Sequence, residues 1–266
     1  MSGAQNRRTE RKNAKKTLDD LFTRAQTVNV IHYSCESFYN RIDGSSPRIT
    51  SIAVRNLLNG QTSSFSIHQV AERNKISAID IEQHYNHLEK QMLGEFYDFV
   101  ERRESYDWLH WNMRDSNYGF QAIAHRYNVL DGKSVPIADA KQHDLSRILF
   151  AIYGRNYADH PRLSTVIKIN NMTTKDFLQG KDEADAFKDK EYVKLHQSTL
   201  RKVDLLAGIA KLTYEEELKT QAKWRDIYGL DLAAWTEMIT DHWLYKLIGG
   251  IGIGTILTVI AFIVGS

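Results

Sequence analysis

Residues 49–70 read ITSIAVRNLLNGQTSSFSIHQV, and this stretch carries the clearest signal for the fold. Two runs rich in β-branched and apolar residues lie on either side of the dipeptide Asn59-Gly60. Asn-Gly readily adopts the positive φ angles of a tight hairpin turn and is the strongest short-range hairpin signal. The stretch therefore predicts two antiparallel strands joined near Asn59-Gly60.

Strand and helix patterns alternate outward from this hairpin. The preceding segment, VNVIHYSCESF at 28–38, has the apolar content of another strand, and the turn cluster DGSSP follows it. After the hairpin, apolar residues recur every three or four positions from Ile81 to Phe96, which is typical of a helix. A fourth strand is expected at 107–111, and further helices over 117–130, 137–153, 160–171 and 190–212. This order predicts an α/β protein with a mixed sheet flanked by helices.

The end of the chain is strongly apolar. Residues 247–265, LIGGIGIGTILTVIAFIVG, contain no charge. A helix of this length spans roughly 28 Å, close to the hydrocarbon thickness of a bilayer. Trp243, Tyr245 and Lys246 precede it, as expected at a cytoplasmic membrane interface. The alternative is a buried core helix. The pattern favours one C-terminal transmembrane helix, with membrane lipid as a partner and a cytoplasmic soluble domain.

The apolar segment is also rich in glycine. Gly250 and Gly254 form a small-xxx-small pair, which Thr258 extends by one more step of four. Small residues let membrane helices approach closely, so we expect a homo-oligomer formed through this helix. The alternative is that the glycines only loosen the helix, because glycine is a poor helix former.

Charge is unevenly distributed. The formal net charge is only +2, which gives no overall argument for nucleic acid or an acidic partner. Residues 6–16, NRRTERKNAKK, nevertheless hold six basic residues and one acid. Such a run predicts a solvated, largely disordered arm, which could also contact anionic lipid or phosphate groups. The single cysteine, Cys35, excludes an intrachain disulfide and a cysteine zinc site and fits a reducing compartment.

These patterns divide the chain into four parts. Residues 1–27 are expected to form the basic arm, which becomes weakly helical at LDDLFTRAQ (18–26), and 28–212 to form the folded domain. Residues 213–246 are polar and amphipathic and are expected to form a juxtamembrane helical stalk. Residues 247–265 form the transmembrane helix.

Several segments of the domain resemble, in degenerate form, the DEDDh family of 3′–5′ exonucleases. VNVIHYSCES, WLHWNMRDSNYGF and LHQSTLRKVDLL follow one another in the family's order, with the hairpin between the first two. The resemblance places Glu36 on the acid of the first strand and His196 on the general base of the last helix. It implies a ribonuclease-H-like fold and a site in which carboxylates hold two divalent ions, Mg²⁺ or Mn²⁺.

The remaining acids of the family pattern are missing in this register. Ser34, Asn117 and Lys202 stand where the family has acids, and Asp115 and Asp204 each lie two residues away. Serine is a poor ligand for a hard dication, and a lysine ammonium repels one. The register therefore predicts weak or no exonuclease activity. With a shifted register, Glu36, Asp115 and Asp204 are the expected metal ligands, converging with His196 at the end of the sheet.

Simpler structural roles are also open for these residues. Glu36 could cap a turn, His196 could be a core histidine, Asp115 could cap a helix and Asp204 could be solvated. The leading functional hypothesis is a membrane-anchored protein whose exonuclease-like domain binds, senses or degrades nucleic acid, such as a defence effector. The alternative is a non-enzymatic membrane adaptor or an oligomerising membrane effector that uses the domain for interactions. The number of acids that meet in the cleft discriminates between them.

Overall fold

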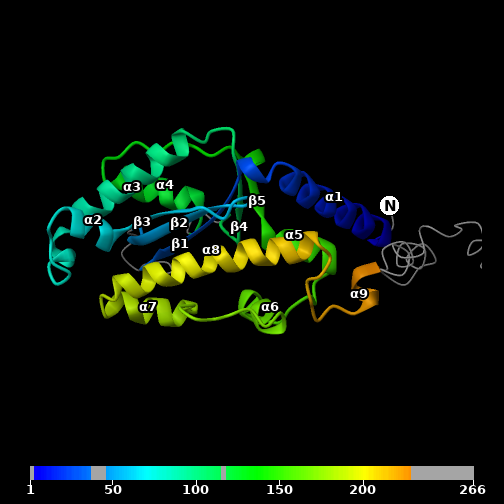
Figure 1. Ribbon diagram of the computed structural model, residues 1–266. Coiled ribbons are helices and arrows are strands. Elements are labelled where there is room, and N and C mark those ends of the chain that lie inside the picture. Colours follow the sequence, from blue (N-terminus) through cyan, green and yellow to red (C-terminus); the bar gives the residue numbers. More distant parts are fainter. Residues whose placement is uncertain (1–2, 37–45, 115–117, 229–266) are drawn as a thin grey trace, which may run out of the picture.

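The computed structural model describes residues 3–36, 46–114 and 118–228. Its centre is a five-stranded mixed sheet in the order β3-β2-β1-β4-β5 (Figure 1). Strand β2 is antiparallel to both β1 and β3, whereas β4 is parallel to β1 and to β5. The strands are β1 Val28–Cys35, β2 Ile49–Asn56, β3 Thr62–Ser66, β4 Asp107–His110 and β5 Gln142–Asp144. The predicted α/β class with a mixed sheet is thus confirmed.

Helices cover both faces of the sheet (Figure 1). Helices α2, α3 and α4 pack against one face, and α8 crosses β1 and β2 on the other, with α1 and α5 beside it. The α-helices are α1 Gly3–Thr23, α2 Ile67–Arg73, α3 Tyr85–Glu101, α4 Phe120–Val129, α5 Leu145–Tyr153, α6 Arg162–Ile169, α7 Gly180–Lys188, α8 Tyr192–Tyr214 and α9 Trp224–Tyr228. Short 3₁₀ turns are η1 Ala25–Thr27, η2 Ile81–His84 and η3 Asp139–Lys141.

The hairpin forms where the sequence predicts it. Strands β2 and β3 pair from Ser51↔Ser66 to Arg55↔Thr62. Gly60 has a φ of +71°, the left-handed conformation for which the Asn-Gly turn is suited. Asn59 also accepts a hydrogen bond from the backbone N–H of Gln61 at 2.9 Å, so the turn closes on its own side chains.

The sheet face beneath α8 changes character along the strands. At the start of β1, Val28 and Val30 pack with Leu109 and with apolar residues of α5 and α8. Towards the end of β1 the same face carries His32 and Ser34, and β2 adds Ser51, all of them buried. Because successive side chains alternate between faces, the opposite face stays apolar, with Ile31, Tyr33 and Cys35 packed in the core beneath α3. We therefore take the polar half of the interface between α8 and the sheet, around His32, Ser34 and Ser51, as the candidate site.

The N-terminal segment differs from its prediction. The sequence predicts a largely disordered arm over 1–27, but Gly3–Thr23 form α1. Its apolar residues Ala14, Leu18 and Leu21 are buried in the core beneath α5 and α8. Arg11 donates a hydrogen bond to the carbonyl oxygen of Ile152 at 3.2 Å, at the end of α5 where helix carbonyls lack partners. Arg11 thus helps to dock the helix, whereas Lys12 and Lys16 are exposed.

The C-terminal part is only partly described. The predicted stalk begins inside α8, and then the chain runs back along the domain, where Leu218 is buried and the Gln221 N–H donates to the Tyr157 carbonyl at 2.9 Å. Residues 229–246 and the expected transmembrane segment 247–265 lie outside the described residues. Within the described ranges, no helix combines the length and the apolar character that crossing a bilayer requires.

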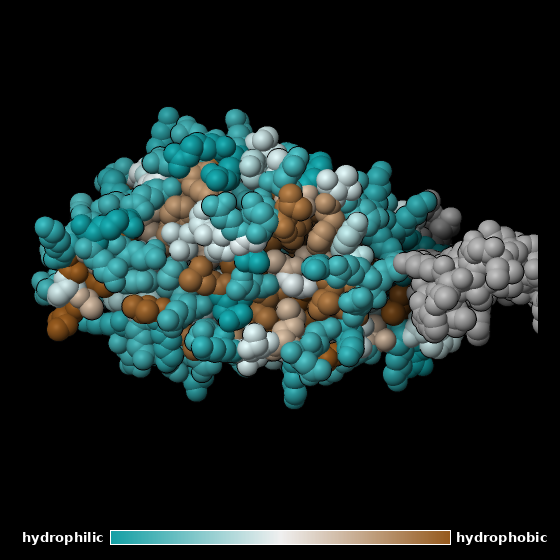
Figure 2. Space-filling view, in the orientation of Figure 1, coloured by the Kyte–Doolittle hydropathy of each residue, from teal (hydrophilic) through white to brown (hydrophobic). Residues whose placement is uncertain are grey.

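The surface seen in Figure 2 is mostly hydrophilic, with hydrophobic residues in small groups among polar ones. Scattered apolar residues of this kind are ordinary on folded domains.

Candidate functional site

A buried ion pair lies beneath α8, in the polar half of its interface with the sheet. Lys202 of α8 places its Nζ 2.7 Å from Oε1 of Glu183, which comes from α7. Ser34 of β1 donates a hydrogen bond to the same oxygen at 2.9 Å. Both charged side chains are almost inaccessible, with 7% of Lys202 and 1% of Glu183 exposed. We call Ser34, Glu183 and Lys202 the buried polar cluster.

Hydroxyl groups extend this cluster across the sheet. Thr199 of α8 donates to the Ser34 Oγ at 3.1 Å, and Ser51 of β2 donates to Thr199 at 2.6 Å. Ser198 reaches the Glu183 Oε1 at 3.4 Å and accepts from the backbone N–H of Leu178 at 3.1 Å. Side-chain hydrogen bonds therefore join α8, α7, β1 and β2. They form a connected polar network inside the interface between α8 and the sheet.

The electrostatics of the cluster oppose a divalent ion. A buried carboxylate is stable only when it is paired, and here the lysine ammonium supplies the positive charge. A dication at this position would have to displace or face that ammonium. Among the described residues, no group of three or more His, Cys, Asp and Glu side chains is arranged to hold a metal ion.

His196 lies on α8, six residues before Lys202. Its Nε2 is 3.3 Å from the Ser64 Oγ, and its ring contacts that of His68 on α2, with centroids 5.1 Å apart. Burial, with His68 alongside, lowers the pKa of His196 to about 4. Nearby His32 is buried on β1, and burial together with Lys202 lowers its pKa well below the usual value. These histidines are neutral at pH 7.

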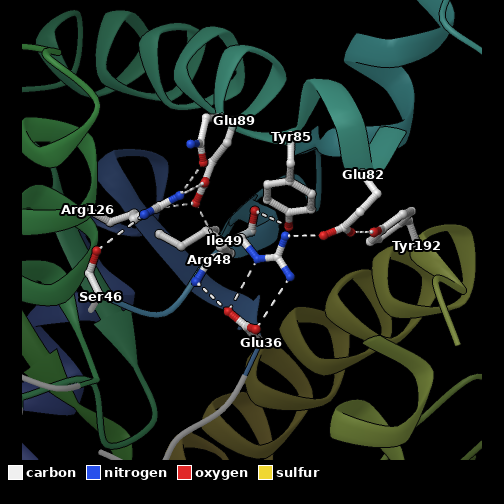
Figure 3. Close-up of polar contacts among 10 residues, drawn as sticks. Glu36, Ser46, Arg48, Ile49, Glu82, Tyr85, Glu89, Arg126 and Tyr192 are labelled. Atoms are coloured by element: carbon white, nitrogen blue, oxygen red, sulfur yellow. Dashed lines mark hydrogen bonds and ion pairs between the residues drawn. The ribbon is translucent and has the colours of Figure 1, made fainter. Parts of the chain in front are cut away.

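Glu36, directly after β1, belongs to a different set of contacts (Figure 3). Its carboxylate pairs with Arg48, whose Nε lies 3.3 Å from Oε2. Arg48 also pairs with Glu82 at 2.6 Å and lies over the ring of Tyr85 at 4.6 Å. Glu82 in turn accepts from the Tyr192 hydroxyl at 3.1 Å. Glu36 thus joins the end of β1 to the start of β2 and, through Arg48, to η2 and α8.

A second ion pair lies close to these contacts. Arg126 of α4 donates to both carboxylate oxygens of Glu89 on α3, with Nε 3.0 Å from each. Glu89 also accepts from the backbone N–H of Ile49 at 2.6 Å. The buried carboxylate has partners from a strand and another helix, as Figure 3 shows, so this pair is structural.

Asp204, the candidate ligand on α8, lies towards the other end of β2. Its Oδ1 pairs with Arg55 at 3.0 Å, and 43% of its side chain is exposed. Arg55 and Ile49 are six residues apart on one extended strand, about 20 Å at 3.3 Å per residue. Glu36 and Asp204 therefore pair with arginines near opposite ends of β2 and are not brought together. The other candidate, Asp115, lies outside the described residues.

The fold thus brings together two of the positions in which the acids of the exonuclease pattern are replaced. Ser34 and Lys202 meet at one oxygen of Glu183, whereas the partners of Glu36, His196 and Asp204 lie in three other places. Glu183 itself was missed by sequence reasoning. The sequence contains one weak indication that Glu183 is buried. It lies three positions before Ala186 and four before Phe187, so all three share one face of α7.

Comparison with known proteins finds no counterpart: no family model, no curated protein and no solved structure matches this chain.

Proposed function

We propose that this protein is a membrane-anchored, non-catalytic adaptor built on a ribonuclease-H-like domain that is related to DEDDh exonucleases. The mixed sheet, in the order β3-β2-β1-β4-β5 with β2 antiparallel to both of its neighbours and β1, β4 and β5 parallel, is compatible with such a fold. The domain then serves as an interaction module and does not degrade nucleic acid.

The observation that carries this proposal is the buried polar cluster. The resemblance assigns metal-binding acids to the positions of Ser34 and Lys202, and the contact of both side chains with one oxygen of Glu183 supports the proposal. Both contact the same oxygen of Glu183, and the Lys202 ammonium itself neutralises that carboxylate. In this proposal the Lys202 ammonium takes the place that Mg²⁺ or Mn²⁺ would need at the buried polar cluster, and among the described residues no other group of His, Cys, Asp and Glu side chains is arranged to hold a metal ion.

The membrane role rests on sequence and on the position of two helices. The apolar segment 247–265 is long enough to span a bilayer. Helix α1, which holds the basic run 6–16, and α9, after which that segment follows, both contact α5 (Figure 1). In this proposal the basic helix faces anionic lipid, which attracts lysine and arginine near the surface.

The test uses the full-length protein in mild detergent, with labelled single-stranded DNA and RNA and added MnCl₂. We expect no cleavage and no Mn²⁺-dependent rise in Tm, since an ion that does not bind cannot stabilise the fold. The double variant Ser34→Asp/Lys202→Asp, which gathers three carboxylates, should gain a Mn²⁺-dependent rise in Tm.

The matched control is Ser34→Asn/Lys202→Asn, which removes the ammonium without adding charge and should show no such rise. Cleavage by the unmodified protein that depends on Mn²⁺ and disappears in Glu36→Gln would overturn the proposal, because it would mean that other residues complete an active metal site.

A further inference from the structure

Strand β3, Thr62–Ser66, forms one edge of the sheet and has β2 as its neighbour. It lies between the helix layers, with α3 on one face and α8 on the other (Figure 1). An edge strand presents a row of backbone N–H and C=O groups with which a further strand can pair. Natural sheets protect their edges with charged residues, proline or very short strands, and the opposite edge, β5, has only three residues.

The pairing pattern shows which groups of β3 point away from β2. In an antiparallel pair of strands, hydrogen-bonded residue pairs alternate with non-hydrogen-bonded pairs. The Asn56 N–H donates to the Gln61 carbonyl at 2.9 Å, which makes these two residues a hydrogen-bonded pair. Counting along the register, Ser63 is the next residue of β3 that bonds to β2. Thr62 and Ser64, on either side of it, therefore direct their backbone N–H and C=O groups outward.

These outward backbone groups have no hydrogen-bond partner in the part of the chain that the structure describes. Thr62 and Ser64 bond there through their side chains. The Thr62 hydroxyl donates to the Gly60 carbonyl at 3.3 Å, and the Ser64 hydroxyl lies 3.3 Å from Nε2 of His196. Both residues are partly exposed. Backbone donors and acceptors are strong hydrogen-bonding groups, so this edge is able to bind another strand.

The sequence of β3 also lacks the residues that usually protect an edge. Its five residues, TSSFS, include no charge and no proline. Apart from Phe65, which packs against Phe96 with ring centroids 5.6 Å apart, they carry small hydroxyl side chains. The nearby Arg55 of β2 is paired with Asp204 at 3.0 Å. A further strand can therefore approach β3 without meeting a charged residue or a proline of that strand.

We propose that two copies of this chain form a dimer by pairing their β3 strands antiparallel, about a two-fold axis that passes beside Ser63. Thr62 of each copy then lies opposite Ser64 of the other, and the outward groups of both copies make four hydrogen bonds across the axis. A second copy is the occupant because these groups lie symmetrically about Ser63, so the strand is its own complement, and because a two-fold contact closes after two copies. The dimer goes beyond the proposed adaptor function and does not depend on the absence of catalysis.

Cysteine cross-linking of the full-length protein in detergent tests the position of the axis. Ser63 would face Ser63 of the other copy as a non-hydrogen-bonded pair, in which the Cα atoms are about 4.5 Å apart and a disulfide can form. Ser63→Cys should therefore give a covalent dimer under mild oxidation. Gln61→Cys is the matched control, because the exposed Gln61 would lie opposite Phe65 of the other copy and not opposite itself. The unmodified protein, whose single Cys35 is buried, gives the background.

Light scattering of Gly250→Leu/Gly254→Leu measures the same contact without the expected association of transmembrane helices. We expect a dimer. Adding Ser63→Lys should weaken it at least tenfold, because two ammonium groups meet at the axis, whereas Gln61→Lys adds the same charge away from the axis and should weaken it less than twofold. The Tm of each variant shows that it is folded.

Two results overturn the proposal. One is a monomer in Gly250→Leu/Gly254→Leu, and the other is Ser63→Cys that cross-links no more than Gln61→Cys. Neither result bears on the adaptor function, which is tested by cleavage and by Mn²⁺.

Discussion

At the scale of single residues, charge pairing decides how the polar half of the α8 interface is built. A lone buried ammonium or carboxylate is very costly, and the cost falls only when the partners meet with good geometry. Lys202 and Glu183 meet at 2.7 Å, and the Ser34 hydroxyl adds a hydrogen bond at 2.9 Å. Neither charged residue can therefore be exchanged alone without leaving the other unpaired.

The first prediction concerns this pair. Lys202→Met should lower the free energy of unfolding by about 3–5 kcal/mol, because it leaves the Glu183 charge buried and unpaired. Combining it with Glu183→Gln should restore at least half of that loss. The measurement is urea denaturation of the full-length protein in detergent, followed by tryptophan fluorescence. Lys211→Met is the control, since Lys211 is largely exposed on the same helix. Additive losses in the double variant would contradict the pairing argument.

The second prediction concerns pH. The pKa of His196 is lowered to about 4 in the folded protein, whereas the unfolded chain titrates near 6.5. The unfolded state thus binds more protons between these values, and the stability contributed by the neutral histidine is complete above about pH 6.5 and is lost as pH falls towards 4. In His196→Gln the decrease in stability over this range should be smaller by up to about 1.4 kcal/mol per pH unit. An unchanged slope would mean that His196 does not titrate there.

At the scale of elements, α1 and α7 acquire their roles through packing. α1 is highly charged, yet its buried residues Ala14, Leu18 and Leu21 fall on one face at spacings of three and four. A helix of mixed charge becomes stable when such a face is covered, and here α5 and α8 cover it. α7 is likewise a polar helix with one buried face, which holds Glu183 beside Ala186 and Phe187.

The third prediction tests the docking of α1. Leu21→Ala should destabilise the protein by about 2–5 kcal/mol, the usual range for a fully buried leucine. Lys16→Ala, on the exposed side of the same helix, should change stability by less than about 0.5 kcal/mol. Limited trypsin digestion provides a second measurement, in which cleavage within 6–16 should be slow in the unmodified protein and fast in Leu21→Ala. Equally rapid cleavage in both would support a disordered arm instead.

At the scale of the whole molecule, polar residues gather in two separate regions. The buried polar cluster lies beneath α8 on one side of the central strands, and a cavity lined by His110 and Arg147 lies beyond the ends of β4 and β5.

The fourth prediction is the membrane topology. Because 247–265 contains no charge and follows Lys246, the full-length protein should remain in the membrane fraction after extraction with alkaline carbonate or high salt. A chain truncated at Thr240 provides the comparison and should be recovered in the supernatant. Release of the full-length protein by carbonate would show that the segment does not span the bilayer.

The fifth prediction is self-association through the same segment. Gly250→Leu/Gly254→Leu should lower the oligomeric order in detergent, as measured by light scattering, because bulky side chains keep the helices apart. Membrane insertion should be unaffected, since leucine is at least as apolar as glycine. An unchanged oligomer would rule out a glycine interface.

The sequence by itself determined the features that depend on neighbours along the chain. The Asn59-Gly60 hairpin, the helical period from Ile81 to Phe96 and the strand at β4 are local patterns, and each has its predicted element in the structure. Local pattern was insufficient for β5, which has only three residues, and for α7, which has few apolar residues.

Only the tertiary structure decided what the polar residues do. Ser34 and Glu183 are 149 positions apart, and no spacing along the chain indicates that they share a hydrogen bond. The same holds for Glu36, whose carboxylate is taken by Arg48, and for Asp204, which pairs with Arg55. The physical reason is that burial and charge pairing are relations between distant segments. A residue's type limits its possible partners, and only the packing of α7 and α8 on the sheet selects among them.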